Sequence, residues 1–411
     1  MKKRVFVLVA VLMLAAALLS LSAFAADNVR YVANAAMGTG DGLTAENATT
    51  LDKAFTELNT NVFTKAEHAG ETCTIYLVED ITLMQYRPEG KNSPRTAQVF
   101  SEDAHADNAV AILTMPGKAK ATITFPYGTT SATRVYNYLL SGETSFDNVI
   151  FTTGAKGSIQ IPVIAAHGHK LTLGAGVETV KADGCHGVAV AGITFSANTF
   201  RTKQGEKAAN VFTPDVTVLG GEYEYIAAFS YNAVVAAGSS AKLTLGNVKV
   251  GTLTATNHTG GTVAANTSVE IVYTGKVEAE EFWPTRRPAD FNPGNASTFT
   301  HTLLEGAELV YTDMDVTKAT NATLNLRFDP TNAAVAKQAK ALYDALNGNA
   351  NIGTFTFSTV TTDPVCADDA HVKVTAKLTE ATCAEGAMEY DYCSVCGKML
   401  SEIRKGEPDA T

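Results

Sequence analysis

Five residues near the C-terminus have the types and the spacing of metal ligands: Cys366, His371, Cys383, Cys393 and Cys396. Cys393 and Cys396 form a C-x-x-C sequence, a tight turn that directs two thiolates at one tetrahedral metal ion. Cys383 is expected to supply a third ligand, and either Cys366 or His371 a fourth. This ligand set suits zinc, and a site closed by four protein ligands is structural rather than catalytic.

Disulfide bonds are the alternative use of these cysteines. The four cysteines of the tail allow three pairings, and an oxidising compartment would permit them. We favour zinc because of the C-x-x-C turn. Either kind of cross-link would hold together a segment that is too small to fold on a hydrophobic core alone.

A second candidate site surrounds Trp283, the one tryptophan of the chain. It lies in the stretch 278–288, which we interpret as a loop that leaves the sheet between two strands. An aromatic face with polar partners is what a sugar-binding platform needs. We therefore predict that Trp283, Arg286, Arg287 and Tyr273 bind a ligand. The alternative is that Trp283 covers the side of the fold.

The N-terminus predicts export. The basic residues 2–4 precede an uncharged apolar run from Val5 to Leu21, and residues 23–25 (Ala-Phe-Ala) form a small-x-small cleavage site. We predict a signal peptide over residues 1–25, with an uncleaved membrane anchor as the alternative. No later stretch is long and apolar enough to span a membrane, so we expect a secreted or cell-surface protein.

The elements that position these sites are short strands. Between residues 108 and 315, runs with alternating apolar residues are separated by Gly, Asn and Asp, and the string K-L-T-L-G occurs twice. Comparable strands begin at Leu171, Val216, Leu243 and Val269, in steps of 45, 27 and 26 residues. If the longest step holds two shorter repeats, this period indicates a solenoid of stacked coils.

The solenoid predicts which side chains face inward: Leu171, Leu173, Val216, Val218, Leu243, Leu245, Val269 and Ile271. An antiparallel β-sandwich is the rival architecture, but Asn-Gly and Asp-Gly hairpin signals are sparse. Two helices are expected, over 51–58 and 330–347, because their apolar residues recur at helical spacing.

Two segments carry resemblances to known families. The string G-T-G-D-G-L-T-x-E-N-A at 38–48, the helix after it and T-I-Y-L-V at 74–78 resemble the N-terminal cap of pectate-lyase-like proteins. The resemblance implies an all-β fold, a right-handed parallel β-helix with an N-terminal helical cap. The strings A-T-C-A-E-G and Y-D-Y-C-S-V-C-G-K resemble short zinc-knuckle-like modules of secreted Gram-positive surface proteins.

We therefore expect four parts. They are a signal peptide (1–25), a β-helix with an N-terminal cap and a C-terminal helix (26–358), a linker (359–365) and a Cys-rich module (366–411). The single module and the abrupt end lead us to expect a piece of a longer protein.

Catalytic signals are weak. His167-Gly168-His169 is compatible with a polysaccharide hydrolase, but the paired carboxylates of such enzymes are missing upstream. A lyase would need calcium beside an Arg or Lys base. We assign no catalytic residue, and calcium is expected only if the protein is a lyase.

The leading functional expectation is an adhesin-like surface protein whose rigid face binds a glycan or another host ligand. The alternatives are a polysaccharide lyase or hydrolase of the pectin-lyase-like fold, and a structural stalk of a longer surface protein. The net charge of −10, from 32 basic and 42 acidic residues, argues against a nucleic-acid partner. We expect a monomer.

Overall fold

The computed structural model describes residues 27–34, 38–83, 97–98, 108–125, 137–140, 142–153, 161–193, 211–263, 266–285, 296–316, 319–360, 366, 370–379, 381 and 386–406. The signal peptide predicted over 1–25, Cys383, Arg286 and Arg287 lie outside these residues.

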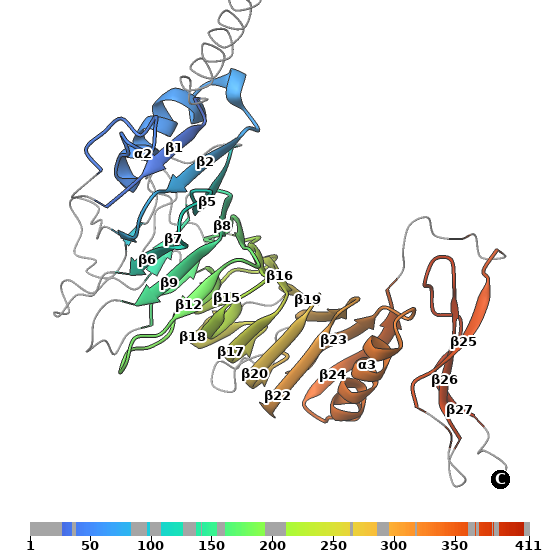
Figure 1. Ribbon diagram of the computed structural model, residues 1–411. Helices are drawn as coiled ribbons and strands as arrows, with labels where there is room; N and C mark the ends of the chain where they lie inside the picture. Colours follow the sequence, from blue (N-terminus) through green and yellow to red (C-terminus); the bar gives the residue numbers. More distant parts are fainter. Residues whose placement is uncertain are drawn as a thin grey trace, which may run out of the picture.

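The described chain winds into a parallel β-helix (Figure 1). The longest sheet has eleven strands, in the order β1 (Val29–Val32), β2 (Thr72–Leu77), β5 (Ala109–Thr114), β8 (Thr144–Asp147), β11 (Lys170–Leu173), β14 (Asp215–Val218), β16 (Ser240–Leu245), β19 (Ser268–Tyr273), β21 (Thr298–Leu303), β23 (Ala319–Phe328) and β24 (Ile352–Thr359). Each strand pairs in parallel with its neighbours, so the fold predicted from the alternation and the repeats is confirmed.

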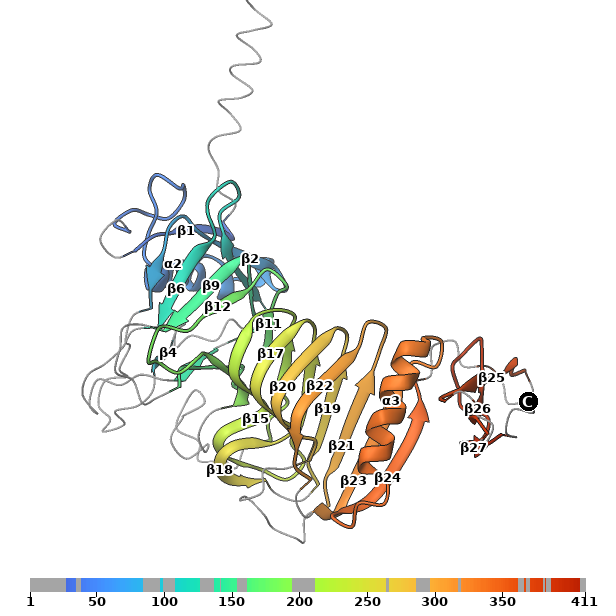
Figure 2. The ribbon, with the colours of Figure 1, turned by 60° about the horizontal axis from the view of Figure 1, so that its bottom comes forward.

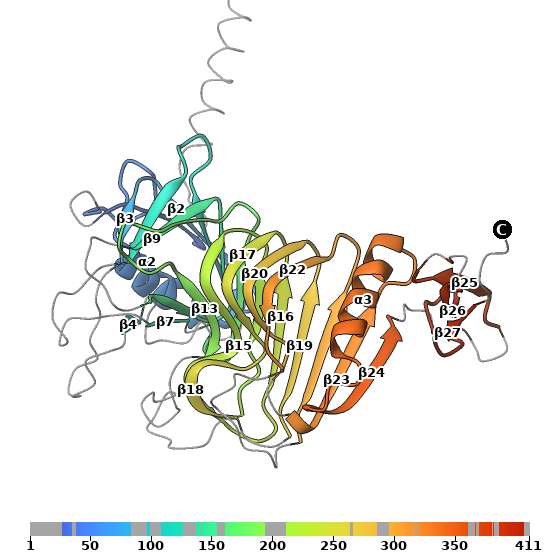
Figure 3. The same ribbon diagram turned by 90° about the horizontal axis from the view of Figure 1, so that it is seen from below.

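Two further sheets form the other sides of the coils. One contains β4 (Ala97–Gln98), β7 (Asn137–Leu139), β10 (Val163–Ala165), β13 (Ala189–Ile193), β15 (Glu222–Val235), β17 (Val248–Thr254), β20 (Lys276–Trp283) and β22 (Glu308–Met314), with β18 (Asn257–Val263) beside β15. The other contains β3 (Ile81–Thr82), β6 (Ala121–Phe125), β9 (Val149–Thr153) and β12 (Glu178–Val180). Figure 3 shows β13, β15, β17, β20 and β22 following one another along the solenoid.

The register stacks like positions into columns that run along the axis. One inward column of the eleven-stranded sheet reads Arg30, Ile75, Ile112, Phe146, Leu173, Val218, Leu245, Tyr273, Leu303, Phe328 and Thr359. All eight side chains predicted to face inward are buried. Alternation works here because successive strand residues point to opposite faces, and one face is the core.

The prediction for the longest step in the repeat was wrong. Leu171 pairs directly with Val216, so the step of 45 residues from one to the other is one coil, which contains β12 and β13, and not two shorter repeats. The register partner of Leu243 is Ile271, two residues beyond Val269. Both residues face inward, because a shift of two positions keeps the same face of a strand.

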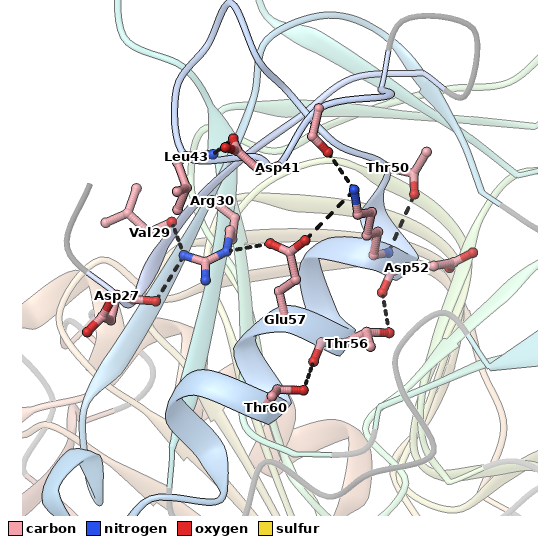
Figure 4. A network of polar contacts seen from close by, with 12 residues as sticks. Asp27, Val29, Arg30, Asp41, Leu43, Thr50, Asp52, Thr56, Glu57 and Thr60 are labelled. Carbon is pink, nitrogen blue, oxygen red and sulfur yellow. Dashed lines mark hydrogen bonds and ion pairs between the residues drawn. The ribbon is translucent and has the colours of Figure 1, made fainter. Parts of the chain in front are cut away.

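A helix covers the N-terminal end. α2 (Leu51–Leu58) begins at Thr50, whose side chain accepts a hydrogen bond from the Lys53 amide, and it continues as the π-helix η1 (Asn59–Phe63). A short 3-10 helix, η2 (Ala66–His68), follows. Figure 4 shows the tie between this helix and the first strand: buried Arg30 contacts Glu57 of α2, with 3.3 Å between Nε and Oε2. The predicted helix over 51–58 is confirmed.

A second helix lies at the far end of the solenoid. α3 (Ala333–Leu346) starts at Asn332, whose side chain accepts hydrogen bonds from the amides of Ala334 and Val335. It connects the parallel neighbours β23 and β24 and packs alongside them (Figure 2). Gln338 Nε2 donates to the Leu309 carbonyl of β22. α3 therefore lies against β22, at the position where earlier coils have a strand of the same sheet.

The stretch around Trp283 corrects the prediction of a loop. Residues Lys276–Trp283 form β20, which pairs with β17 on one side and with β22 on the other. The strand packs on the core through its buried residues Val277, Ala279 and Phe282. The many charged residues of the stretch hid this strand pattern in the sequence.

In the described part of the chain, no helix has the length and apolarity needed to cross a membrane.

Candidate metal centre and binding groove

A small antiparallel sheet carries the cysteine-rich segment. Its strands are β25 (Lys373–Lys377), β26 (Met388–Cys393) and β27 (Arg404–Lys405), in that order. Asp391 joins all parts of it, since its carboxylate contacts Lys373 and Arg404 at 2.8 Å each and accepts a hydrogen bond from Thr375. The charge-assisted hydrogen bonds from Arg404 and Lys373 hold the pKa of Asp391 well below its usual range.

The end of β26 forms the metal-binding turn. The amide of Gly397 donates to the Cys393 carbonyl at 2.8 Å, and the Cys393 amide donates to the Lys398 carbonyl at 2.8 Å. Gly397 has φ of +74°, a conformation that a residue with a side chain adopts only with strain. This turn brings Cys393 and Cys396 together, as the C-x-x-C spacing predicted.

Four side chains converge at this turn. Ligand atoms of Cys366, His371, Cys393 and Cys396 all lie within 4.8 Å of one another. The Sγ atoms of Cys366 and Cys393 are 3.7 Å apart, and His371 Nδ1 lies 3.6 Å from Cys396 Sγ.

These two separations match the edges of a zinc tetrahedron. With zinc bonds of about 2.3 Å to sulfur and about 2.05 Å to nitrogen, tetrahedral geometry requires about 3.8 Å between two sulfurs and about 3.6 Å between sulfur and nitrogen. A disulfide would require sulfurs at about 2.05 Å. The described residues therefore fit a closed tetrahedral metal site, with His371 Nδ1 as the nitrogen nearest a ligand sulfur.

The electrostatics of the cluster favour a cation. Burial raises the pKa of the Cys393 thiol, but the amides of Cys396 and Val395 and the His371 side chain outweigh burial and lower this pKa to about 5. Burial and the neighbouring sulfurs Cys396 and Cys393 raise the pKa of Cys366 to about 11. Crowded sulfurs disfavour more than one thiolate, and a bound dication would relieve this repulsion.

The structure resolves part of the uncertainty about which residues are the metal ligands. Cys366 and His371, expected as alternatives, are both in the cluster, together with Cys393 and Cys396. Cys383, expected as the third ligand, lies outside the described residues, and the four described side chains already complete a tetrahedral set. A metal ion can therefore bind here, and its identity as zinc stays a proposal.

A polar groove crosses the side of the coils at β12, β15, β17 and β20. Its volume is about 370 Å³, and it adjoins a second hollow of about 550 Å³ that shares Thr179 and Glu222 with it. Its lining residues are Ile161, Thr179, Val180, Lys181, Gly187, Val188, Glu222, Tyr223, Glu224, Gly251, Thr252, Glu280 and Glu281.

Glu224 is the anchored carboxylate of this groove. Its oxygens contact His186 Nδ1 at 3.1 Å and Lys181 Nζ at 3.3 Å, and they accept a hydrogen bond from the Gly187 amide at 2.9 Å. Partial burial raises the pKa of Glu224, but the Gly187 amide, His186 and Lys181 outweigh burial and lower it overall. This carboxylate therefore acts as a fixed anion and acceptor, not as a proton donor near neutral pH.

The groove is open at Gly251, which has no side chain to fill it. The register of β15, β17 and β20 places Gly251 between Glu224 and Glu280. A Cβ at position 251 would lie 2.6 Å from the Glu224 carbonyl oxygen, so only glycine fits. Two exposed carboxylates, Glu280 and Glu281, form the next rung, and Thr252 donates to Glu281 at 3.4 Å.

Of the predicted ligand-binding residues, the structure describes Trp283 and Tyr273, and these two do not share a surface. Trp283 is partly exposed and lies two residues beyond Glu281 in β20, on the same side of the strand. Tyr273 is fully buried, which leaves none of its ring on the surface. Arg286 and Arg287 lie outside the described residues, so their role stays a prediction. The groove was missed because its residues are far apart in sequence and meet only through the register of the coils.

Comparisons of this chain with protein-family models, with curated proteins and with solved structures found no match.

Proposed function

We propose that this chain is a secreted or cell-surface protein whose β-helix presents the polar groove to a glycan ligand. The observation that supports this most is the groove itself, an open row of hydrogen-bonding side chains on the rigid floor of a parallel sheet. Rungs about 4.8 Å apart repeat such side chains along one direction, as an extended polymer requires. The partly exposed indole of Trp283 near Glu281 offers an apolar face for a sugar ring.

We further propose that the metal of the C-terminal cluster is zinc, in a structural role. Three cysteines and one histidine form a closed set, and two of the distances between their ligand atoms match the edges of a zinc tetrahedron. Zinc would there supply cross-linking of the chain segments that carry the ligands. Nothing in this set leaves a position for a substrate.

A polysaccharide lyase or hydrolase is the second candidate, because Glu222, Glu224, Glu280 and Glu281 line one groove. The lowered pKa of Glu224 counts against its acting as a general acid, which needs a raised pKa. A β-helix alone does not separate binding from cleavage. If neither is found, a structural stalk is the remaining interpretation.

The test uses residues 26–411 and a panel of insoluble and immobilised polysaccharides, with and without calcium. Retention without new chain ends is expected. Trp283→Ala and the double variant Glu280→Gln/Glu281→Gln should each weaken retention about tenfold or more, since a handful of residues carries most binding energy. New chain ends would replace the binding proposal with the enzyme.

Glu308→Gln is the control for loss of a carboxylate outside the groove. Glu308 is an exposed carboxylate on β22, and it is absent from the lining of the groove. Its loss removes one negative charge and should leave retention unchanged. Equal weakening by Glu308→Gln would show that overall charge, and not the groove, holds the polysaccharide.

A further inference from the structure

Both ends of one inward column are polar. The column begins at Arg30 in β1 and ends at Thr359 in β24, whereas the nine residues between them are aliphatic or aromatic. Arg30 is 2% exposed and Thr359 is 6% exposed, so neither polar group meets bulk water. A buried polar group is costly without a hydrogen-bonding partner. Arg30 donates to the carbonyls of Asp27 and Val29 beside it and, like Thr359, it also has a partner in an element outside the coils.

At the N-terminal end the partner belongs to a cap. Arg30 pairs with Glu57 of α2, the helix that covers the first coil. At the opposite end, the Thr359 hydroxyl donates to the carbonyl oxygen of Gly397, the residue that follows Cys396 in the metal-binding turn. The cysteine-rich sheet therefore contacts the polar end of the column in the last coil, as α2 contacts its polar end in the first coil.

Apolar contacts repeat this relationship. The Tyr390 ring of β26 packs edge-on against Phe328 of β23, with 5.4 Å between the ring centroids. Tyr390 is fully buried, and it belongs with Leu378 to the same hydrophobic cluster as the core of the solenoid. All three ribbon views place β25–β27 beyond β24 and α3, at the end opposite α2 (Figures 1–3).

The metal ligands join the chain leaving the solenoid to this sheet. Cys366 follows β24 by a few residues and His371 precedes β25, whereas Cys393 ends β26 and Cys396 lies in the turn after it. One ion bound by all four would fix the exit of the β-helix, the turn and the Gly397 carbonyl in a single arrangement. A sheet of three short strands cannot maintain that arrangement on its own core.

We propose that metal binding makes the described residues of the segment 366–406 a cap that closes the C-terminal end of the β-helix. This inference rests on the proposed metal site and is independent of glycan binding. Without the metal, the sheet loses its cross-link, the Phe328 ring loses the cover of Tyr390, and the Thr359 hydroxyl loses its acceptor. The metal then controls the local stability of the last coils as well as that of the module.

The test is hydrogen–deuterium exchange on residues 26–411, with one equivalent of zinc and after its removal by a chelator. Removal of zinc should speed exchange of β25–β27, and it should speed exchange at the C-terminal ends of β23 and β24 about tenfold or more. Exchange in α2, β1 and β2 should not change. If β23 and β24 exchange equally with and without zinc while β25–β27 respond, the site is real and the cap is wrong.

Two variants separate docking from metal binding. The Tyr390 hydroxyl has no hydrogen-bond partner among the described residues, so Tyr390→Phe should behave as the wild type. Tyr390→Ala should keep one zinc per chain, measured by a colorimetric chelator, and should make exchange of β23 and β24 insensitive to zinc.

A third variant covers the case in which Tyr390→Ala unfolds the module. Thr359→Val changes only the solenoid side of the contact, and it should keep the zinc while reducing the zinc-dependent protection of β24. Full zinc-dependent protection of β24 in Thr359→Val would overturn the cap. Failure of the wild type to hold any zinc would instead overturn the metal site on which the cap rests.

Discussion

The Tyr273 hydroxyl donates to His301 Nδ1 over 2.9 Å inside the core of the β-helix. The other ring nitrogen of His301, Nε2, donates to the Pro284 carbonyl at 2.8 Å. The Pro284 carbonyl can only accept, so Nε2 carries a proton, and in the neutral ring that burial favours, Nδ1 is the acceptor for the Tyr273 hydroxyl. His301 occupies a column position between Ile271 and Leu326, so an ionisable ring stands where neighbouring coils place aliphatic residues.

This buried histidine predicts loss of stability in acid. Burial lowers the pKa of His301 to about 4, although the Pro284 carbonyl opposes the shift, whereas an unfolded histidine has a pKa of about 6.5. The unfolded state therefore binds the proton first. The contribution of His301 is full above pH 6.5 and declines as pH falls towards 4, by about 1.4 kcal/mol per pH unit.

The measurement is urea unfolding between pH 7.5 and 4. The double variant Tyr273→Phe/His301→Leu removes both polar partners. The free energy of unfolding of this variant should fall less steeply with falling pH than that of the wild type. The difference in slope should correspond to the uptake of close to one proton on unfolding. His167, whose pKa burial also lowers to about 4, is present in both proteins and cancels in the comparison. If the stabilities of the two proteins changed in parallel with pH, His301 would not be the source of the loss of stability in acid.

The inward and outward faces of one strand predict a contrast in stability. Leu243 is fully buried in β16, and the adjacent Thr244 lies on the outer face of the strand. Leu243→Ala should lower the free energy of unfolding by about 2–5 kcal/mol, because it leaves a cavity in the core. Thr244→Ala should change it by less than about 0.5 kcal/mol in the same urea titration. Similar effects would mean that the register is shifted by one residue.

Sequence periodicity predicted the fold because one face of every coil is buried. Leu171, Leu173, Val216 and Val218 could be assigned from alternation alone, since their Lys or Thr neighbours lie on the outer face. The length of each coil could not be predicted in the same way. The 45-residue coil after Leu171 pairs as one unit with Val216, because solenoid coils tolerate insertions at their turns without changing the strand register.

The sites were predictable to different degrees. The turn at Cys393 and Cys396 is local, so its spacing identified it, whereas the choice of Cys366 and His371 depends on how β25 and β26 pair. Tyr273 was predicted to bind a ligand at the surface. It lies two residues after the inward-facing Ile271 in β19, so its side chain also faces inward. Only a register shift by an odd number of residues would turn it outward. The groove depends on lateral neighbours such as Glu224, Gly251 and Glu280, and a single sequence does not contain that register.

The opening in the groove predicts the effect of filling it. A Cβ on Gly251 would meet the backbone oxygen of Glu224 at 2.6 Å, and this oxygen cannot move without disturbing β15. Gly251→Ala should therefore cost about 1–3 kcal/mol of stability through overpacking. Gly187→Ala is the matched control, because its Cβ would come closest to the Glu224 side chain, at 3.2 Å. It should cost less than about 0.5 kcal/mol. Equal losses in thermal unfolding would contradict the close approach of β15 and β17 at Gly251.

The described ligand set predicts which cysteine the metal site does not need. Cys366, His371, Cys393 and Cys396 already supply four ligands, so Cys383→Ser should still hold one zinc per chain after dialysis. Cys366→Ser and Cys396→Ser each remove a ligand and should lose stoichiometric zinc. Cys185→Ser, a change at a buried cysteine far along the chain from the cluster, controls for the loss of any thiol. Zinc content is measured by mass spectrometry of the native protein. Loss of zinc in Cys383→Ser, with zinc retained in Cys366→Ser, would mean that Cys383 takes the position assigned to Cys366.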